Sequence, residues 1–502
     1  MSMHSHIRKN AFRILVACLT AGAVYGQGTT LTILHTNDIH ASFMPHEAYW
    51  VKATPRPLVG GFAELKFIVD SIRAVKPATL LLDAGDVMTG NPITEHSYGG
   101  AQGGALFAMM DSIGYDVWCP GNHDFDVSQD NLRALIRIAT FPAVCANLVD
   151  TLGLYPVGNV PYVILERGGL RLGILGLISQ ELYDLVNQNN LTGLRVLSPV
   201  ETAQKFIDEL KPKTDLVIAL THQGVEEDSQ LATGVRGLSI IVGGHSHTRL
   251  RHPKVVEGVL IVQTGSNTEN LGELDMTVEG GRVTQYDGTL IPLWNREKRP
   301  PSSVSVIADS MQREIDRDFD RVICTLRGNW MRSETQSAIG TFLADAQREA
   351  AGAEIGFMNN GGIRRDVSAG PLTKKALFEI LPFRNILTTF QLTGKQLRNI
   401  MVYNIVKKPG IQIAGMSGQY RKRPDGDVEF TSIEVGGKPL DEGRSYPCAA
   451  SDFFVGEAKR YLGEEIRLPV YLKATVFEAV ERIVRARREI IPRVSDLIEQ
   501  VP

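Results

Sequence analysis

The length and composition of the chain favour a large globular protein. Its 502 residues exceed what one ordinary hydrophobic core holds, so we expect at least two domains. The 43% hydrophobic and 22% charged residues exclude fibrous and intrinsically disordered classes. The formal net charge of −3 provides no basic surface for a nucleic-acid polymer, whereas a small phosphorylated substrate needs only local positive charge.

The segment 1–26 has the pattern of a secretory signal peptide. His6–Arg13 is basic, Ile14–Tyr25 is mostly apolar, and small residues follow. We therefore expect a periplasmic or secreted protein. The residues ending at Cys18 resemble a lipoprotein cleavage box, but the apolar stretch before Cys18 is short, so we expect no lipid anchor there. No later segment reaches the roughly 18 apolar residues of a transmembrane helix, so we also expect no transmembrane anchor.

Short apolar runs alternate with helical patterns over 29–295. The predicted strands are Leu31–Leu34, Thr79–Leu82, Val117–Trp118, Leu172–Leu177, Leu216–Leu220, Ser239–Val242 and Leu260–Val262. The predicted helices are Ala63–Val75, Gln129–Ile138 and Thr202–Leu210. This alternation predicts a layered α/β domain built around buried sheets.

A change of composition marks a boundary between two domains. The segment Pro292–Val304 is rich in proline and charge, and Ile307–Arg321 has the pattern of a charged, solvent-exposed helix. We therefore expect a linker over 296–323 and a second domain over 324–500. Within that second domain the sequence predicts helices, a Gly-rich turn and several strands. The predicted helices and turn are Ala338–Ala351, Asn359–Gly362 and Lys374–Ile380.

The cysteines that follow the signal segment show no CxxC pairing. They are Cys119, Cys145, Cys324 and Cys448. This spacing argues against a cysteine zinc site or a redox motif. Buried free thiols are favoured over disulfides.

Aspartate, asparagine and histidine side chains follow five of the predicted strands. They are Asp38 and His40; Asp86; Asn122, His123 and Asp126; His222; and His245 and His247. The carboxyl ends of strands in α/β sheets converge on one ligand site, so these side chains are expected to meet. Oxygen and imidazole ligands suit a pair of divalent ions, with zinc, manganese and cobalt all compatible, and such a pair needs a bridging carboxylate.

The motifs themselves resemble a known family. HTNDIH (35–40), LLDAGD (81–86), PGNHDFD (120–126) and GGHSH (243–247) resemble the 5′-nucleotidase and UDP-sugar hydrolase family of calcineurin-like metallophosphoesterases. IGTFLADA (339–346), MNNGGIR (358–364) and ILPFRN (380–385) are similar to that family's C-terminal domain. The resemblance implies a four-layer α/β/β/α sandwich joined by a helix to a C-terminal α+β substrate-binding domain.

The resemblance also implies a role for each strand-end residue. Asp38, His40 and His247 would hold one metal ion, and Asn122, His222 and His245 the other. Asp86 would bridge both ions. His123 resembles the family's catalytic histidine, and Asp126 would orient it. The implied mechanism is in-line attack by a metal-bound hydroxide.

On the substrate side, the resemblance extends to the C-terminal domain but is incomplete. Asn359, Gly361 and Arg364 match a phosphate- or ribose-binding turn, and Phe383 and Phe453 are candidates for two aromatics that stack a nucleobase. The family's GGDGY-type stretch is replaced by 453–461, without its glycines and aspartate. An arginine expected shortly before the helix at 338–351 is not evident at 335–337. These departures put nucleoside selectivity in question and leave the metal chemistry untouched.

The resulting functional hypothesis is an exported 5′-nucleotidase that acts in nucleotide catabolism. The same site chemistry fits a UDP-sugar pyrophosphatase or a 2′,3′-cyclic-nucleotide phosphodiesterase, and, at a lower rank, a sulfur-transfer hydrolase. A different class is an exported binding protein that has lost catalysis, but the intact metal and histidine motifs argue against it. Neither the oligomeric state nor the identity of the metals follows from the sequence.

Overall fold

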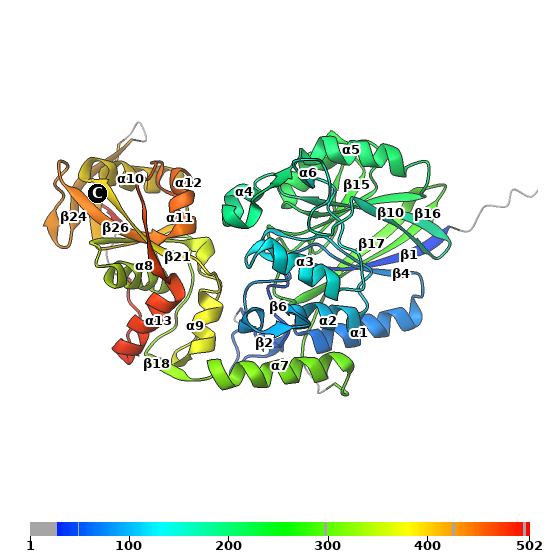
Figure 1. Ribbon diagram of the computed structural model, residues 1–502, viewed down its shortest axis with the longest axis horizontal. Coiled ribbons are helices and arrows are strands. Elements are labelled where there is room, and N and C mark those ends of the chain that lie inside the picture. Colours follow the sequence, from blue (N-terminus) through cyan, green and yellow to red (C-terminus); the bar gives the residue numbers. More distant parts are fainter. Residues whose placement is uncertain (1–27, 49, 296–298, 424–426, 495–497, 502) are drawn as a thin grey trace, which may run out of the picture.

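The computed structural model describes residues 28–501 apart from 49, 296–298, 424–426 and 495–497. The expected signal peptide and Cys18 lie outside the described residues. Two lobes lie side by side, with the N-terminal part of the chain in one and the C-terminal part in the other (Figure 1). Among the described residues, no helix is long and apolar enough to cross a membrane.

The N-terminal lobe contains two sheets. The five-stranded sheet has the order β17-β16-β1-β4-β7, and its strands are β1 (Thr29–Thr36), β4 (Thr79–Asp83), β7 (Val117–Trp118), β16 (Asn270–Glu279) and β17 (Arg282–Pro292). The six-stranded sheet has the order β14-β15-β13-β12-β10-β9, and its strands are β9 (Tyr162–Arg167), β10 (Leu170–Ile178), β12 (Leu216–His222), β13 (Ile240–Gly243), β14 (Lys254–Val256) and β15 (Val259–Val262). β1, β4 and β7 run parallel, as do β10, β12, β13 and β15.

The alternation of side chains along each strand builds four layers. Leu31 and Ile33 of β1 pack between the sheets, whereas Leu34 faces the helices of its own side. In β12, Ile218 joins the core between the sheets and Val217 packs against the helices on the opposite side. The covering helices are α1 (Phe62–Val75), α2 (Gly104–Ile113) and α3 (Gln129–Ile138) on one face, and α5 (Pro199–Leu210) and α6 (Val225–Gly234) on the other. The predicted α/β/β/α sandwich is confirmed.

Several short helical turns and strands complete the N-terminal lobe. The helical turns are η1 (Pro92–Glu95), η2 (Asn122–Phe125), α4 (Leu182–Leu185) and η3 (Gln188–Leu191). The short strands are β2 (His46–Glu47), β3 (Leu58–Val59), β5 (Ser97–Tyr98), β6 (Ala101–Gln102), β8 (Leu148–Asp150) and β11 (Leu194–Val196).

The connecting helix α7 (Ser303–Phe319) corrects one expectation. It was predicted to be a solvent-exposed connector, but Val304, Ala308, Met311, Ile315 and Phe319 form a buried stripe. This stripe packs against the core that α1 and α2 cover, so α7 runs along the N-terminal lobe before the chain enters the other lobe (Figure 1). The prediction of solvent exposure was wrong because charged residues on the outer face masked the apolar spacing.

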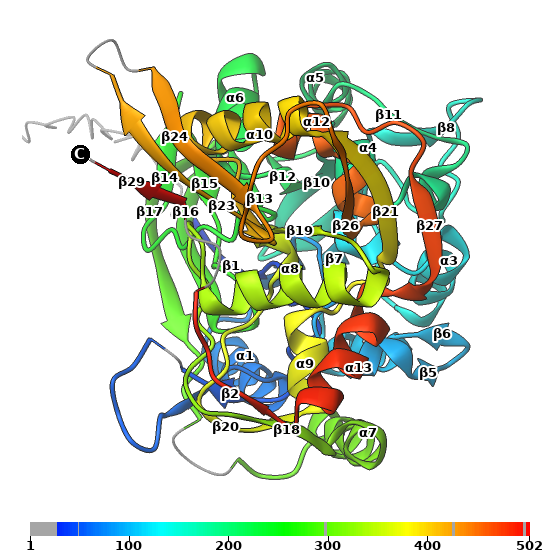
Figure 2. The same cartoon turned by 90° about the vertical axis from the view of Figure 1, so that its left-hand side faces the viewer.

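The C-terminal lobe is built around a mixed five-stranded sheet with helices on its faces (Figure 2). This sheet has the order β22-β19-β26-β21-β27, with β19 (Ile355–Asn359), β21 (Ile386–Thr393), β22 (Ile411–Ala414), β26 (Ser445–Ser451) and β27 (Val470–Thr475). Smaller sheets contain β18 (Val322–Leu326), β20 (Gly370–Thr373), β23 (Met416–Lys422), β24 (Val428–Val435), β25 (Lys438–Pro439), β28 (Glu489–Ile490) and β29 (Ile498–Gln500). The helices are α8 (Ala338–Ala351), η4 (Asn360–Gly362), α9 (Lys374–Ile380), α10 (Gly394–Lys407), α11 (Asp452–Gly456), α12 (Ala458–Leu462) and α13 (Val476–Arg487). α8 and α9 have the bounds that the sequence predicted.

The four cysteines within the described residues are all free and buried, as expected.

Candidate metal centre and active site

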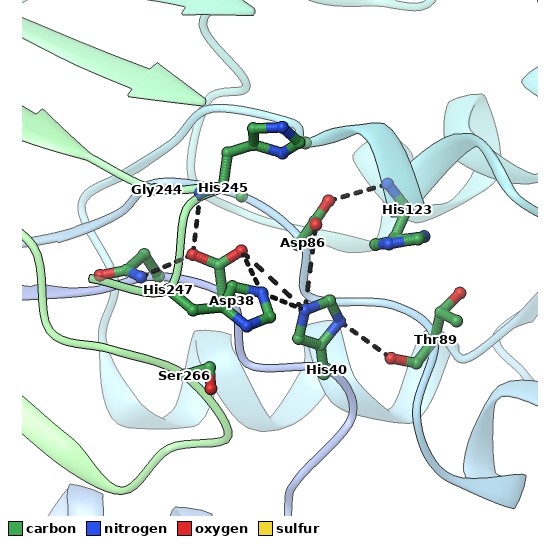
Figure 3. Close-up of polar contacts among 12 residues, drawn as sticks. Asp38, His40, Asp86, Thr89, His123, Gly244, His245, His247 and Ser266 are labelled. Atoms are coloured by element: carbon green, nitrogen blue, oxygen red, sulfur yellow. Dashed lines mark hydrogen bonds and ion pairs between the residues drawn. The ribbon is translucent and has the colours of Figure 1, made fainter. Parts of the chain in front are cut away.

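Five loops bring the candidate side chains to one edge of the sandwich. Asp38 and His40 follow β1, Asp86 follows β4, and the segment 122–126 follows β7. His222 ends β12, while His245 and His247 follow β13. Since β1, β4 and β7 are parallel in one sheet and β12 and β13 in the other, their carboxyl ends deliver these loops to a common site (Figure 3).

The backbone of these loops is held in an unusual conformation. Asp38, His40 and Asp86 have φ angles of 51°, 48° and 57°, in the left-handed region that side chains rarely adopt. Hydrogen bonds between the loops keep them there: the N–H of Asp38 donates to Gly85 O (2.8 Å), and that of His40 donates to Asp86 O (2.9 Å). At Gly121 a side chain has no room, since a Cβ would lie 2.2 Å from Asp86 Oδ1.

The first ligand cluster consists of Asp38, His40 and His247. Their ligand atoms lie within 4.8 Å of one another. Nδ1 of His40 lies 3.1 Å from Thr89 O, and a carbonyl only accepts, so Nδ1 carries the proton and Nε2 presents a lone pair. Nε2 of His247 lies 3.0 Å from His40 Nε2 and 3.2 Å from Asp38 Oδ1.

The second ligand cluster consists of Asp86, His222 and His245, again with ligand atoms within 4.8 Å. Nδ1 of His222 donates to Ala84 O (2.6 Å), which leaves Nε2 at 3.2 Å from both Asp86 Oδ2 and Asn122 Oδ1. The same Asn122 oxygen lies 3.0 Å from His245 Nδ1. Because Asp86 Oδ2 also lies 4.0 Å from His40 Nε2, this carboxylate faces both clusters.

The electrostatics of the two clusters suit divalent cations. Burial opposes the charge on Asp38 and Asp86, yet neighbouring histidines hold the pKa of both carboxyls below its usual range. Burial lowers the pKa of His245 to about 4, and burial and Arg364 lower that of His40, so both imidazoles are neutral. Burial also opposes the charge on His222, but Asp86 and Asp38 outweigh burial and raise its pKa to about 10. Asp38 Oδ1 is buried without a hydrogen-bond donor. Buried carboxylates and bare imidazole nitrogens are a donor set for zinc, manganese or cobalt.

A histidine–aspartate pair lies beside the clusters, with His123 on η2 and Asp126 directly after it. Nδ1 of His123 donates to Asp126 Oδ2 (2.8 Å), and the backbone N–H of His123 donates to Asp86 Oδ1 (2.8 Å). Burial lowers the pKa of His123, but Asp126 and Asp86 outweigh burial and leave the pKa raised. The His123 ring centroid lies 5.3 Å from that of His40. Because Nδ1 of His123 is bonded to Asp126, Nε2 is the ring nitrogen available to a ligand held at the clusters.

Two structural residues of the site were not singled out from the sequence. Asp124 accepts backbone N–H groups from Gly121, Asp86, Val87 and Met88 at 2.7–3.0 Å, and so ties the β7 loop to the β4 loop. Asn37 donates to Asp38 Oδ2 (2.6 Å) and orients that carboxylate. Both lie inside recognised motifs, where their position next to ligands was the available signal.

The C-terminal lobe brings two of its predicted residues to this site. Nη2 of Arg364 lies 2.9 Å from His40 Nε2, and the Phe383 ring lies 5.3 Å from that of His123. Asn359 is buried, with Nδ2 3.5 Å from the hydroxyl of Tyr461, and Gly361 O lies 3.5 Å from Arg364 Nη1.

Phe453 and Arg332 are two further residues of the C-terminal lobe that bear on the substrate-side prediction. Phe453 on α11 packs against the core of its own lobe, and within the described residues it makes no ring contact with Phe383. Arg332 was missed: it bonds Ile363 O and Asp366, and its charge acts on neighbouring Arg364. Arg332 lies before residues 335–337, where the family pattern places an arginine. Because its distance from the helix at 338–351 differs from that pattern, the sequence analysis did not identify it.

Comparisons with known proteins match both lobes. The calcineurin-like phosphoesterase family matches residues 31–249, and the 5′-nucleotidase C-terminal domain matches residues 322–462. The chain belongs to the 5′-nucleotidase family. Its membership makes it a metal-dependent phosphoester hydrolase, which confirms the predicted enzyme class.

Individual members of the 5′-nucleotidase family align over most of their length. A protein named 5′-nucleotidase from Vibrio cholerae serotype O1 is 28% identical over 505 residues, covering 88% of this chain and 87% of its own. Protein UshA from Yersinia enterocolitica is 26% identical over 484 residues, covering 84% of each chain. The crystal structure of a 5′-nucleotidase precursor from Thermus thermophilus superposes with a TM-score of 0.81 at 26% identity, covering 94% of this chain and 100% of that one.

Proposed function

We propose that this protein is an exported 5′-nucleotidase that uses two divalent ions to release phosphate from nucleoside monophosphates. The observation that carries the proposal is the Asp86 carboxylate facing both ligand clusters, with the His123–Asp126 pair at their side. Export rests on the signal-peptide pattern of 1–26.

In this proposal Asp38, His40 and His247 hold one ion, and Asn122, His222 and His245 the other, with Asp86 shared. When bound, the two ions supply Lewis-acid activation of the phosphoryl group and of the attacking water. The hydrogen bonds of His40 to Thr89 O and of His222 to Ala84 O orient the two rings so that each Nε2 faces Asp86.

His123 is the proposed catalytic histidine. Asp126 holds the proton on Nδ1, so Nε2 is directed to the substrate, and the raised pKa favours a protonated ring. In that form Nε2–H stabilises negative charge on the phosphoryl oxygens and delivers a proton to the leaving oxygen.

The C-terminal lobe is proposed to bind the rest of the substrate. Arg364 reaches the metal clusters and carries a bidentate guanidinium suited to phosphate, with Arg332 as a second positive charge. Phe383 offers a ring face for a nucleobase. Asn359 and Gly361 shape the turn that carries Arg364, while Phe453 is the weaker of the two proposed stacking residues.

Phosphate release from a substrate panel tests the proposal. The panel contains AMP, UMP, UDP-glucose, 2′,3′-cyclic AMP and an aryl phosphodiester, each with added manganese or zinc and with a chelator. Chelator-sensitive release that is fastest with AMP or UMP is the expected result. A preference for UDP-glucose or cyclic AMP would replace the nucleotidase by a pyrophosphatase or a cyclic phosphodiesterase. The His123→Ala variant, with its metal content measured, is the matched control for contaminating phosphatase.

A further inference from the structure

The side chain of Thr89 touches the catalytic pair without belonging to any motif position interpreted above. Thr89 lies in the loop after β4 and is buried, with 6% of its surface exposed. Its hydroxyl donates to Asp126 Oδ2 at 2.6 Å. The same oxygen accepts the Nδ1 proton of His123 at 2.8 Å. One carboxylate oxygen thus binds both donors.

The backbone of Thr89 is strained, and its surroundings hold it in place. Its φ angle is 65°, and a β-branched side chain is rare in this left-handed region. The carbonyl of Thr89 accepts the Nδ1 proton of His40 (3.1 Å), and a Cβ on the next residue, Gly90, would lie 2.2 Å from His40 O. The strained conformation therefore directs the Thr89 carbonyl to a ligand of one cluster and the hydroxyl to Asp126.

The Asp126 carboxylate needs such a restraint. Asn190 donates from Nδ2 to the carbonyls of Phe125 and Asp126 (2.9 and 3.1 Å), which holds the backbone of this segment. The Asp126 side chain, however, is 21% exposed, so water competes for its oxygens. A second donor on Oδ2 keeps that oxygen on His123 Nδ1 rather than turned to solvent.

We propose that Thr89 is a positioning residue that holds Asp126, and through it His123, in the geometry for proton delivery to the leaving oxygen. The inference rests on the role of His123 in the proposed function. Thr89 acts on His123 through its hydroxyl alone, whereas its contact with His40 uses the backbone carbonyl. Removal of the hydroxyl should therefore impair the leaving-group step and leave the metal ligands in place.

The first test compares Thr89→Val with Thr89→Ser and with Thr94→Val. Valine keeps the shape and the β-branch, and serine keeps the hydroxyl. Thr94 is a buried threonine of the same segment whose hydroxyl donates to Asn91 O. Thr89→Val should lower kcat for AMP about tenfold, the scale of one charge-assisted hydrogen bond, with KM and metal content unchanged. Its kcat for an aryl phosphate with a good leaving group should change less than about twofold, because that leaving group needs little protonation.

The rescue by serine separates positioning from packing. Thr89→Ser should restore the AMP rate to within about threefold of the unmodified protein, and Thr94→Val should leave it unchanged. Equal losses for Thr89→Val and Thr89→Ser, equal losses for both substrates, or full activity of Thr89→Val would each overturn the proposal. If Thr89→Val fails to fold, Thr89→Gly replaces it, because glycine tolerates this φ angle and also lacks the hydroxyl.

A spectroscopic test keeps this inference distinct from the proposed function. In protein labelled with ¹⁵N-histidine, the hydrogen-bonded Nδ1 proton of His123, assigned by its loss in His123→Ala, should exchange slowly. It should exchange faster in Thr89→Val and slowly again in Thr89→Ser. Unchanged exchange in Thr89→Val refutes the positioning role even if the enzyme hydrolyses nucleotides. Wild-type protein that releases no phosphate from any ester refutes the proposed function, whatever the exchange shows.

Discussion

A single backbone or carboxylate oxygen accepts the Nδ1 proton in each of three imidazoles of the site. His40 and His222 donate from Nδ1 to Thr89 O and Ala84 O, and His123 donates from Nδ1 to Asp126. In the proposed function, Nε2 of the first two rings faces a metal ion, and Nε2 of the third faces the substrate. In this proposal the imidazole binds metal where a backbone carbonyl accepts its Nδ1 proton, and it transfers a proton where a carboxylate does.

Asp86 is the carboxylate that faces both clusters. In Asp86→Asn the neutral amide lacks the charge that faces His40 and His222, so we expect fewer than two ions per chain. The loss of activity should exceed about 100-fold, which is the upper end of the losses seen when a residue that only hydrogen-bonds a metal ligand is removed. Elemental analysis and phosphate release measure the two effects. Asp130→Asn, which removes a carboxylate 92% exposed on α3, is the control. Two ions per chain in Asp86→Asn would exclude the bridging role.

Phe383 tests the substrate side. Phe383→Ala should raise KM for AMP about tenfold, because stacking of a base on an aromatic ring contributes about 1–3 kcal/mol, and should leave an aryl phosphate nearly unaffected. Phe342→Ala, which removes a ring that packs against Trp330 in the same lobe, controls for general loosening. Steady-state kinetics of Phe383→Ala with both substrates measure this difference. An equal loss of activity on AMP and on the aryl phosphate would mean that Phe383 supports His123 by packing.

At the scale of elements, the site depends on loops held by buried polar side chains under the strands. Asp124 ties the β4 and β7 loops together, and Asp228 on α6 performs a similar task beneath β12. Asp228 Oδ1 accepts from Thr221 Oγ1 (2.7 Å) and Gln223 Nε2 (3.1 Å), the residues on either side of His222. Its Oδ2 is buried without a partner.

Asp228 should make stability depend on pH. Burial raises its pKa from 3.8 to about 7, so between these values only the unfolded chain releases the proton. The stabilisation by the protonated carboxyl is complete below pH 3.8 and is lost as the pH rises to about 7, by up to roughly 4 kcal/mol. In Asp228→Asn, the free energy of unfolding relative to wild type should therefore increase from pH 4 to 7 and stay constant above.

Urea unfolding with saturating metal at several pH values measures this difference. The Asp208→Asn variant, which changes an exposed residue of α5, controls for the loss of a carboxylate in general. A difference between Asp228→Asn and wild type that does not vary with pH would show that Asp228 ionises in the folded protein as it does in the unfolded chain.

At the scale of the molecule, polar and aromatic contacts join the two lobes. Arg384 Nη2 pairs with Glu95 Oε2 (2.5 Å), Arg56 Nη1 donates to Ser368 Oγ (2.7 Å), and Phe378 packs edge-on against Phe319 of α7. The contact between Arg364 Nη2 and His40 Nε2 (2.9 Å) also joins the lobes. In the proposed function, the C-terminal lobe thereby completes a site whose metal ligands all come from the N-terminal lobe.

Metal removal should destabilise the N-terminal lobe. Asp38 and Asp86 are buried carboxylates, and a ligand present at 100 times its Kd stabilises the state that binds it by about 2.7 kcal/mol. A chelator should therefore lower the melting midpoint by several degrees in scanning calorimetry, and added manganese or zinc should restore it. Asp86→Asn should respond much less. An unchanged midpoint in protein shown to be metal-free would contradict the proposed metal centre.

Local patterns of the sequence determined the layered α/β architecture and the strand-end motifs. Apolar alternation and helical spacing are properties of neighbouring residues, so α3, α8 and α9 could be bounded from them. The ligand loops could be grouped because carboxyl ends of parallel strands meet at one edge. The solvent exposure predicted for α7 failed because burial depends on the partner surface as well as on the helix's own charge.

Only the tertiary structure decided which distant side chains touch. The contact between Arg364 and His40 spans 324 positions of the sequence, and that between Thr89 and Asp126 spans 37. No local pattern encodes such contacts, because they depend on how the lobes and loops pack. The sequence by itself therefore determined the kinds of chemistry available to this protein, and the packing of loops and lobes decided which atoms are placed to perform it.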